Sequence, residues 1–311
     1  MKLKYILLFV VLSIVYSCHE EEALEPLSTE MSLRFEFPEG DAAWDLDIAD
    51  IAEKYKTYLI YKNLTTEDFN QAWKGSSGVL TGSPLNEERA LFYTNFMKDH
   101  VFAFLNPKVM EQVLPVYIYM AYNVYSPTLW GKAPTSDKYD GMDFWCFCLE
   151  SDSEEIVFPY QPLVRPRTAW DFKLRRGIIL KNIIDRIVDK GKIDIPSVFT
   201  DDFDYVTEVK HLLGTENDKN YYKKRGFPGQ LGGRYDSFGK LLYIKDTSPR
   251  KNFIDYMHLA IRYTRDSVAI LYPPGEYPKI IQYYDFTVDY LKKDYNWDIA
   301  KSAEMPVIEN Q

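Results

Sequence analysis

Residues 170–190, WDFKLRRGIILKNIIDRIVDK, hold the longest run of apolar side chains at helical spacing in this chain. One stripe of the predicted helix contains Phe172, Ile179, Ile183 and Ile187, and beside it lie Leu180, Ile184 and Val188. The charged side chains of the stretch face elsewhere: Arg175, Arg176, Lys181, Asp185 and Arg186. This spacing predicts a long amphipathic helix that packs its apolar face on a core.

The chain after this helix is predicted to be mostly helical. Helices are expected at 198–213, after Pro196, and at 252–272 and 277–295, which Pro273-Pro274-Gly275 separates. Residues 225–240 are rich in glycine and predict a long loop. Because the loop has neither GxGxxG nor GKS or GKT, it does not match the phosphate-binding patterns.

The chain before the helix is predicted to hold most of the strands. Strands are expected at 32–37, 58–61, 143–149 and 156–160, with an aromatic, β-prone stretch at 115–125. Helices are expected at 42–55 with Asp41 as N-cap, at 86–104 and at 108–112, and loops at 73–84 and around Pro127, Gly131 and Pro134. The pattern predicts an α+β fold over 32–301, as one domain or with a boundary near Arg165, followed by a tail at 302–311.

Composition excludes some classes of function. Hydrophobic residues make up 46% of the chain and charged residues 27%, as in globular proteins. A net charge of −9 argues against nucleic-acid binding, which needs clustered Lys and Arg. Cys146 and Cys148 are too close in sequence for an unstrained disulfide and too few for a zinc site, so two buried thiols are expected.

Residues 1–17 are typical of a secretory signal peptide. Lys2 and Lys4 give a basic start, an apolar run extends from Tyr5 to Val15, and Cys18 follows. The apolar run is shorter than the roughly 20 residues of a membrane-spanning helix. The order resembles a bacterial lipoprotein signal, which implies that Cys18 is the first mature residue and carries acyl chains. An ordinary signal peptide with a chance cysteine is the alternative.

Residues 18–31 predict an acidic tether and a linker. Glu20, Glu21 and Glu22 follow Cys18 closely, and this cluster resembles the surface-export signal of Gram-negative bacteria that display lipoproteins on the outer leaflet. The resemblance implies a lipid-anchored protein of the outer membrane, exposed at the cell surface. A spacer that faces the periplasm is the alternative.

Two carboxylate-x-x-histidine pairs resemble metal ligands. Glu208 with His211, and Asp255 with His258, would each share one face of a helix. Two such pairs are typical of di-metal carboxylate sites, which also need bridging glutamates that the sequence does not identify. The sequence favours the alternative, in which these are capped or surface histidines and no metal is bound.

Aromatic side chains offer candidate ligand contacts. Tyr117 and Tyr119 share one face of a predicted strand, and Trp130 follows in the next loop. Exposed, the rings could stack on sugars or hold peptide side chains; the sequence favours burial in the core. Phe227 and Tyr235, in the loop at 225–240, are the second group of candidate contacts.

Short matches spread over Ser32 to Lys301 resemble the zinc-binding metallopeptidase lipoproteins of Gram-negative surface nutrient importers. They are FPEG at 37–40 with Trp44-Asp45, KYKTYLIYK at 54–62, LNP at 105–107 with Leu114-Pro115, KRGF at 224–227, Ser248-Pro249 with Phe253, and YNWD at 295–298. The resemblance implies a metallopeptidase-like scaffold and a place beside a TonB-dependent channel and its lid lipoprotein.

The zinc motif of that family is missing here. Family members carry His-Glu-x-x-His on a helix, where two histidines bind zinc and the glutamate activates water. The equivalent helix, Trp170 to Lys190, has no histidine and no glutamate. The later motif, Pro-x-Glu-Asp-Phe-Ala-Glu, falls on residues 249–255, where only Asp255 retains a carboxylate. The resemblance therefore implies a degenerate member that has lost catalysis and needs no cofactor.

Three functional hypotheses follow. The first is a non-catalytic surface lipoprotein that binds a substrate, above all a peptide, or a partner at the importer. The second is an active zinc metallopeptidase with a displaced site, so the status as an enzyme stays open. The third is a glycan-binding surface lipoprotein that uses its aromatic side chains.

Overall fold

The structure is a computed structural model that describes residues 34–71, 79–152, 160–232, 241–242 and 247–308. The predictions for Cys18, for the acidic cluster at 20–22 and for Tyr235 lie outside the described residues, as does nearly all of the strand predicted at 156–160. The following description concerns Phe37–Gln311, which forms one compact unit. No helix within the described ranges is both long enough and apolar enough to span a membrane.

A four-stranded sheet lies in the first half of the chain, in the order β1–β3–β7–β6. Its parallel strands are β1 (Tyr58–Ile60), β3 (Tyr117–Met120) and β7 (Phe144–Phe147), and β6 (Asp137–Lys138) is antiparallel to β7. Every residue of β3 and β7 is buried, as expected for central strands that are covered on both faces.

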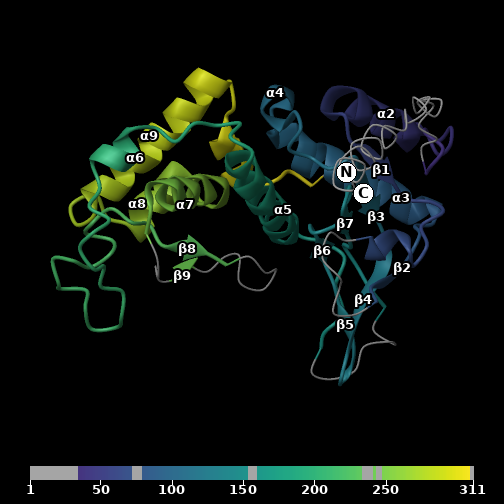
Figure 1. Cartoon of the computed structure of the whole chain (residues 1–311), viewed down its shortest axis with the longest axis horizontal. Coiled ribbons are helices and arrows are strands. Elements are labelled where there is room, and N and C mark those ends of the chain that lie inside the picture. Colours follow the sequence, from purple (N-terminus) through teal and green to yellow (C-terminus); the bar gives the residue numbers. More distant parts are fainter. Residues whose placement is uncertain (1–33, 72–78, 153–159, 233–240, 243–246, 309–311) are drawn as a thin grey trace, which may run out of the picture. The chain divides into compact units, whose positions relative to one another are not determined.

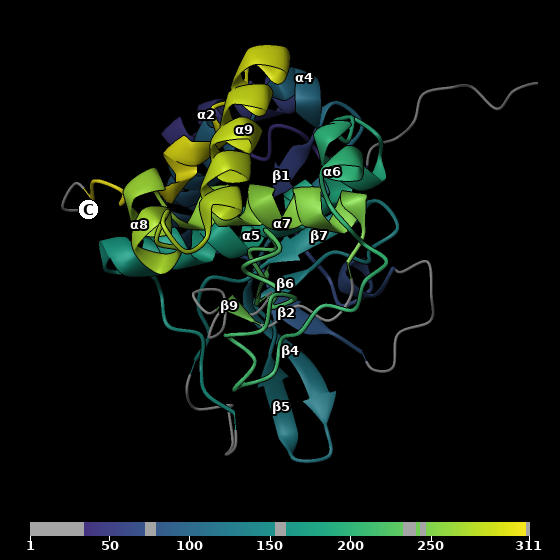
Figure 2. The same cartoon turned by 90° about the vertical axis from the view of Figure 1, so that its left-hand side faces the viewer.

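A second, antiparallel sheet contains β2 (Thr81–Ser83), β4 (Tyr122–Thr128) and β5 (Gly131–Pro134). β4 and β5 form a hairpin whose tip lies away from the helices in both views (Figures 1 and 2). The loop predicted here from its prolines and glycine was wrong. β5 is an edge strand of this sheet. A proline such as Pro134 is tolerated there, because an edge strand pairs with a neighbour on one side only.

The helices of the first half confirm most of the predicted ones. They are α2 (Ala43–Tyr55), the short η1 (Asp68–Asn70), α3 (Glu87–Asn95) continued by the π-helical η2 (Phe96–Val101) and the 3-10 turn η3 (Phe102–Phe104), and α4 (Pro107–Met110). The cap of α2 is Ala42 and not the predicted Asp41, because the Asp45 carboxylate accepts the Ala42 N–H at 3.0 Å. The described part of the predicted first strand, 34–37, contains bends and is not a strand.

The second half is helical, as predicted (Figure 1). Its helices are α5 (Ala169–Asp189), α6 (Val198–Asp201), α7 (Pro249–Arg262), α8 (Arg265–Leu271), α9 (Pro278–Tyr295) and the 3-10 turn η4 (Ile299–Ala303). β8 (Gln230–Leu231) and β9 (Leu241–Leu242) form a small antiparallel pair in the loop between α6 and α7. The chain is therefore α+β, with sheets mostly early and helices late.

Two helix boundaries were predicted wrongly, both because side chains compete for backbone groups. The predicted helix at 198–213 ends at Asp201, and the Asp204 carboxylate then accepts the N–H groups of Val206 and Thr207. The predicted helix at 252–272 divides into α7 and α8, because the Thr264 hydroxyl accepts the Ser267 N–H and caps a new helix.

Helix α5 lies at the centre of a core that is shared by both halves of the chain. A capping box of Thr168 and Asp171 starts the helix, and all seven apolar residues of the predicted stripes are buried. The prediction that Arg175 and Arg176 face away from the core was wrong. α5 contacts α7, η2 and η4, so even part of its charged side is enclosed. Cys146 and Cys148 are buried free thiols, which confirms that prediction.

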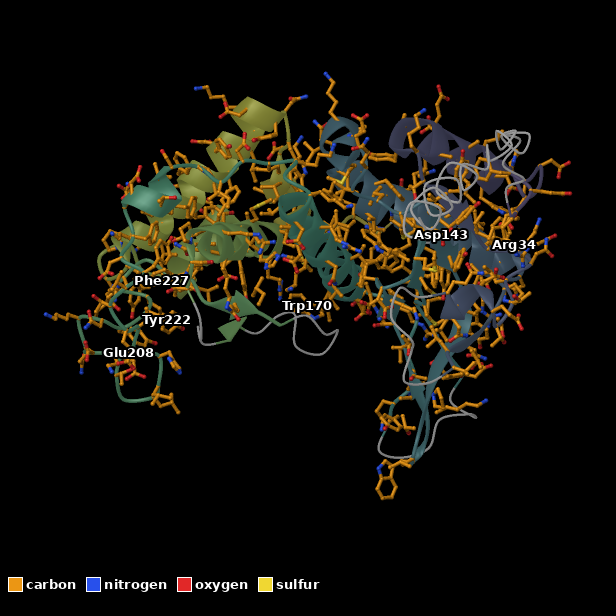
Figure 3. The ribbon with its side chains drawn as sticks, viewed as in Figure 1. Arg34, Asp143, Trp170, Glu208, Tyr222 and Phe227 are labelled. Carbon is orange, nitrogen blue, oxygen red and sulfur yellow. The ribbon has the colours of Figure 1, made fainter. Side chains whose placement is uncertain are left out.

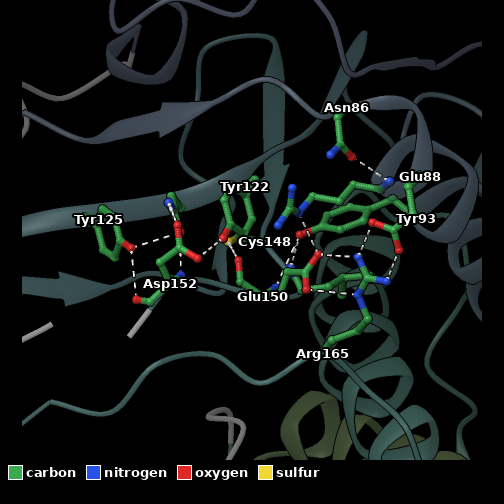
Figure 4. A network of polar contacts seen from close by, with 12 residues as sticks. Asn86, Glu88, Tyr93, Tyr122, Tyr125, Cys148, Glu150, Asp152 and Arg165 are labelled. Atoms are coloured by element: carbon green, nitrogen blue, oxygen red, sulfur yellow. Dashed lines mark hydrogen bonds and ion pairs between the residues drawn. The ribbon is translucent and has the colours of Figure 1, made fainter. Parts of the chain in front are cut away.

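A network of charged side chains ties α3 to the segment that leads into α5 (Figure 4). The Arg165 guanidinium donates to both carboxylate oxygens of Glu150, at 2.9 and 2.7 Å, and also pairs with Glu88. Arg89 donates to the same Glu150 carboxylate at 3.0 Å. The Glu150 side chain is only 14% exposed, so its charge depends on these cations more than a surface charge would.

Replacing Arg165 with Gln is therefore expected to lower the free energy of unfolding by about 1–3 kcal/mol, because Glu150 and Glu88 lose a shared partner. Chemical denaturation measures this change. The matched control is Lys54→Gln, which breaks an exposed pair with Asp50 and should cost less than about 1 kcal/mol. Equal effects of the two variants would show that the Arg165 network contributes no more than a surface pair.

Candidate functional site

The charged residues of α5 and α7 meet where the two helices pack together. From α7, the His258 Nε2 atom lies 3.0 Å from Asp185 Oδ1 on α5, although the ring is not aligned for a straight hydrogen bond. Asp185 Oδ2 in turn accepts from the Lys181 ammonium at 3.3 Å, one helical turn earlier. Asp255, one turn before His258, is 5% exposed, and its Oδ2 atom has no partner within the described part of the chain.

Burial and neighbouring charges shift the pKa values of this cluster in different directions. Burial lowers the pKa of His258, and the Asp185 carboxylate only partly offsets it, so the imidazole is neutral near pH 7. Burial raises the pKa of Asp185, but its contacts with His258 and Lys181 outweigh this effect and the net pKa is lowered. Burial raises the pKa of Asp255 well above its usual value, against the opposing charges of Lys251 and Lys181.

The raised pKa of Asp255 predicts a pH-dependent stability. Between the pKa values of the unfolded and folded states, the folded protein keeps the proton that the unfolded chain releases, so stability falls as pH rises through this window. Asp255→Asn imitates the neutral acid. The variant should be more stable than the wild type by about 1–3 kcal/mol at pH 8 and nearly equal to it at pH 4.

Thermal unfolding of the wild type and Asp255→Asn between pH 4 and 8 measures this difference. Asp289→Asn, which removes an exposed carboxylate from α9, is the matched control and should show no such pH trend. A constant difference between Asp255→Asn and wild type across the range would mean that the Asp255 carboxyl ionises normally.

The four residues predicted as metal-ligand candidates do not meet. Glu208 and His211 lie in the irregular segment after α6, and the exposed Glu208 carboxylate pairs with Lys210 at 3.0 Å. In Figure 3, Glu208 lies far from helix α5. Within the described ranges, no three His, Cys, Asp or Glu side chains come together so that they could hold a metal ion. Sequence inspection missed the pairing of Lys181 and Asp185 with His258; their i, i+4 spacing on α5 was the available signal.

Most of the candidate aromatic contacts lie inside the protein. Tyr117 and Tyr119 are buried on β3, where the Tyr119 ring stacks on Phe144 with the centroids 4.6 Å apart. Phe227 is fully buried and packs against Phe203. Burial of the two tyrosines agrees with the core interpretation that the sequence favoured. In this conformation none of these three rings can contact a ligand at the surface.

Trp130 is the described candidate ring that does reach solvent. It forms the turn of the β4–β5 hairpin together with Leu129, between the paired residues Thr128 and Gly131. Leu129 is 99% exposed and Trp130 is 71% exposed. Two large apolar side chains at the tip of a hairpin form a small surface that is suited to contact with a sugar ring or an apolar partner.

The comparisons with known proteins give one similar structure. No family model matches the chain, and no curated protein matches it. Among solved structures, the chain is similar to the crystal structure of a "putative zinc-binding metallo-peptidase" from Bacteroides caccae, with a TM-score of 0.43 and 10% sequence identity. The similarity covers 85% of this chain and 92% of that chain.

Proposed function

We propose that this chain is a non-catalytic lipoprotein of the outer-membrane surface that binds a peptide or a partner protein at a TonB-dependent importer. Cys18 and the acidic cluster after it support the lipid anchor and the location at the cell surface. The sequence resemblance given above supports the association with an importer. A lipid-anchored protein would hold captured ligand close to a channel in the same membrane.

The observation that carries the non-catalytic part is the arrangement of charges between α5 and α7. Asp185 contacts both Lys181 and His258, so the carboxylate that could bind a metal or transfer a proton is engaged where the two helices pack together. The Lys181 ammonium also places a positive charge beside the carboxylate, which opposes binding of a cation there. A binding role requires none of these groups to be available.

A peptide mixture incubated with the purified protein tests both halves of the proposal. Native mass spectrometry should detect peptides bound to the protein, and chromatography of the mixture should show every peptide intact. Cleavage that Asp185→Asn and His258→Gln abolish would overturn the non-catalytic assignment. Absence of any bound peptide or partner protein would overturn the binding role.

The anchor is tested separately by cell fractionation. Cys18→Ala should move the protein from the outer-membrane fraction to the soluble fraction, because the acyl chains supply the membrane affinity. Protease treatment of intact cells should digest the wild type but not a variant with Glu20, Glu21 and Glu22 replaced by Ala. Membrane retention of Cys18→Ala would contradict lipid anchoring.

Glycan binding is the second candidate function, and the exposure of Trp130 at the hairpin tip favours it. An indole ring that is open to solvent can stack on the apolar face of a sugar. Glycan-array binding that Trp130→Ala abolishes would support this function. Leu129→Ala is the matched control, since it shortens the neighbouring apolar side chain and leaves the indole in place.

A further inference from the structure

We propose that the hollow between η2, α5 and the C-terminal segment 304–308 binds a small zwitterion with an apolar side chain, such as a free amino acid or a dipeptide. The inference rests on the proposed peptide-binding function, because it names the place on the chain and the ligand class. It uses neither the α5–α7 charge cluster nor the hairpin tip.

The hollow has the size and the walls for such a ligand. Its volume is about 490 Å³, within the range of roughly 300–1,000 Å³ that is usual for small-molecule sites. Phe104, Phe172 and Met305 give it apolar walls. A second hollow of about 720 Å³ adjoins it and shares Phe172 and Ile308, so a ligand longer than one residue has room to extend.

Arg176 supplies a buried cation at the wall of the hollow. The side chain is 1% exposed, and its Nη2 atom donates to the backbone carbonyls of Ser302 and Glu304 at 2.7 and 2.6 Å. Its Nε–H has no partner within the described part of the chain. Both acceptors are neutral, so a ligand carboxylate that pairs with the guanidinium from the hollow would offset a buried charge.

His100 adds a second polar group that lacks a partner. Its Nδ1 atom is buried without a hydrogen bond to any described residue, and the ring lines the same hollow. Burial and the nearby Arg176 lower the pKa of His100 to about 4, so the imidazole is neutral near pH 7. A neutral imidazole can donate or accept a hydrogen bond without adding charge to the site.

Negative groups lie on the exposed side of the hollow. Asp99 and Glu304 line it and are exposed, and so is Lys301, so carboxylates outnumber the one cation on the exposed side, whereas Arg176 is buried. A ligand with a carboxylate at the buried end and an ammonium at the open end matches this order of charges. A simple anion would meet the two carboxylates, and an uncharged apolar ligand would leave the Nε–H of Arg176 unsatisfied.

Isothermal titration of the full-length protein in mild detergent with leucyl-leucine tests the site. The same dipeptide blocked at its amino end by acetylation, or at its carboxyl end by amidation, should bind at least about tenfold more weakly, as for the loss of a charged hydrogen bond. Free leucine in a parallel titration distinguishes an amino-acid site from a dipeptide site.

Two variants keep the test independent of folding. Arg176→Lys retains the charge but removes the Nε–H and should weaken binding at least about tenfold. Because Arg176 is buried, this variant can fail to fold. Asp99→Asn is the second variant, since Asp99 is exposed, and it should lower the affinity for leucyl-leucine several-fold. Asp289→Asn, an exposed change on α9, is the matched control and should leave the dissociation constant unchanged.

Leucyl-leucine binding that is weakened by blocking and by Asp99→Asn supports the site. Unchanged affinity of Asp99→Asn, of a folded Arg176→Lys and of the blocked dipeptides would overturn it. If longer peptides bind while leucyl-leucine and leucine do not, the zwitterion site is wrong and the proposed function stands. If no peptide of any length binds, both the site and the peptide-binding function are wrong.

Discussion

Phe199→Ala is expected to lower the free energy of unfolding by about 3–5 kcal/mol, because a fully buried ring is replaced by a cavity. Phe199 lies on α6, a helix of only four residues that has no side-chain cap. Its ring joins α6 to the other helices through contacts with Phe203, Phe253, Tyr256, Tyr283 and Phe286. Burial of this one ring therefore holds a helix that is too short to be stable alone.

Chemical denaturation of Phe199→Ala measures the loss. Val206→Ala is the control, because Val206 is 97% exposed in the segment after α6 and its truncation should change stability by no more than about 0.5 kcal/mol. A loss below about 1 kcal/mol for Phe199→Ala would mean that the aromatic cluster around α6 is not packed as described.

Arg176→Met is expected to lower the free energy of unfolding by about 2–5 kcal/mol, because one buried and one partly buried backbone carbonyl lose their donor. Methionine keeps most of the apolar stem that packs near the Phe104 ring. The guanidinium joins α5 to the carbonyls of Ser302 and Glu304. Amide hydrogen exchange in 302–308 should therefore be faster in the variant than in the wild type, and the increase should be larger there than elsewhere in the chain.

Arg186→Met is the matched control for Arg176→Met, since it makes the same chemical change at an exposed position of the same helix. Its stability should lie within about 0.5 kcal/mol of the wild type. If Arg176→Met behaves like the control, the C-terminal segment is not held through this guanidinium.

The elements with strong local signals were predicted well from the sequence. The apolar spacing of 170–190 predicted α5, and burial of the stripe through Ile179, Ile183 and Ile187 confirms that prediction. α9 was predicted at 277–295, after the break at Pro273-Pro274-Gly275, and it extends from Pro278 to Tyr295. Each of these features depends on residues within a few turns of one another, which a sequence displays directly.

The errors and omissions depend on contacts between distant parts of the chain. Arg176 looks like a surface residue in the sequence, but backbone carbonyls more than a hundred residues later enclose it. Asp185 and His258 meet only because α5 packs on α7. Periodicity assigns each residue to a face of its own element, and it does not say which other element covers that face.

The central claim is that the charged groups between α5 and α7 join two helices and do not hold a catalytic metal. Zinc analysis of the purified protein together with a peptidase assay tests it most directly. We predict less than about 0.1 zinc per chain after dialysis against trace zinc, and no cleavage of bound peptides. Stoichiometric zinc that His258→Ala removes, accompanied by peptide cleavage, would contradict the claim and support the hypothesis of an active zinc metallopeptidase.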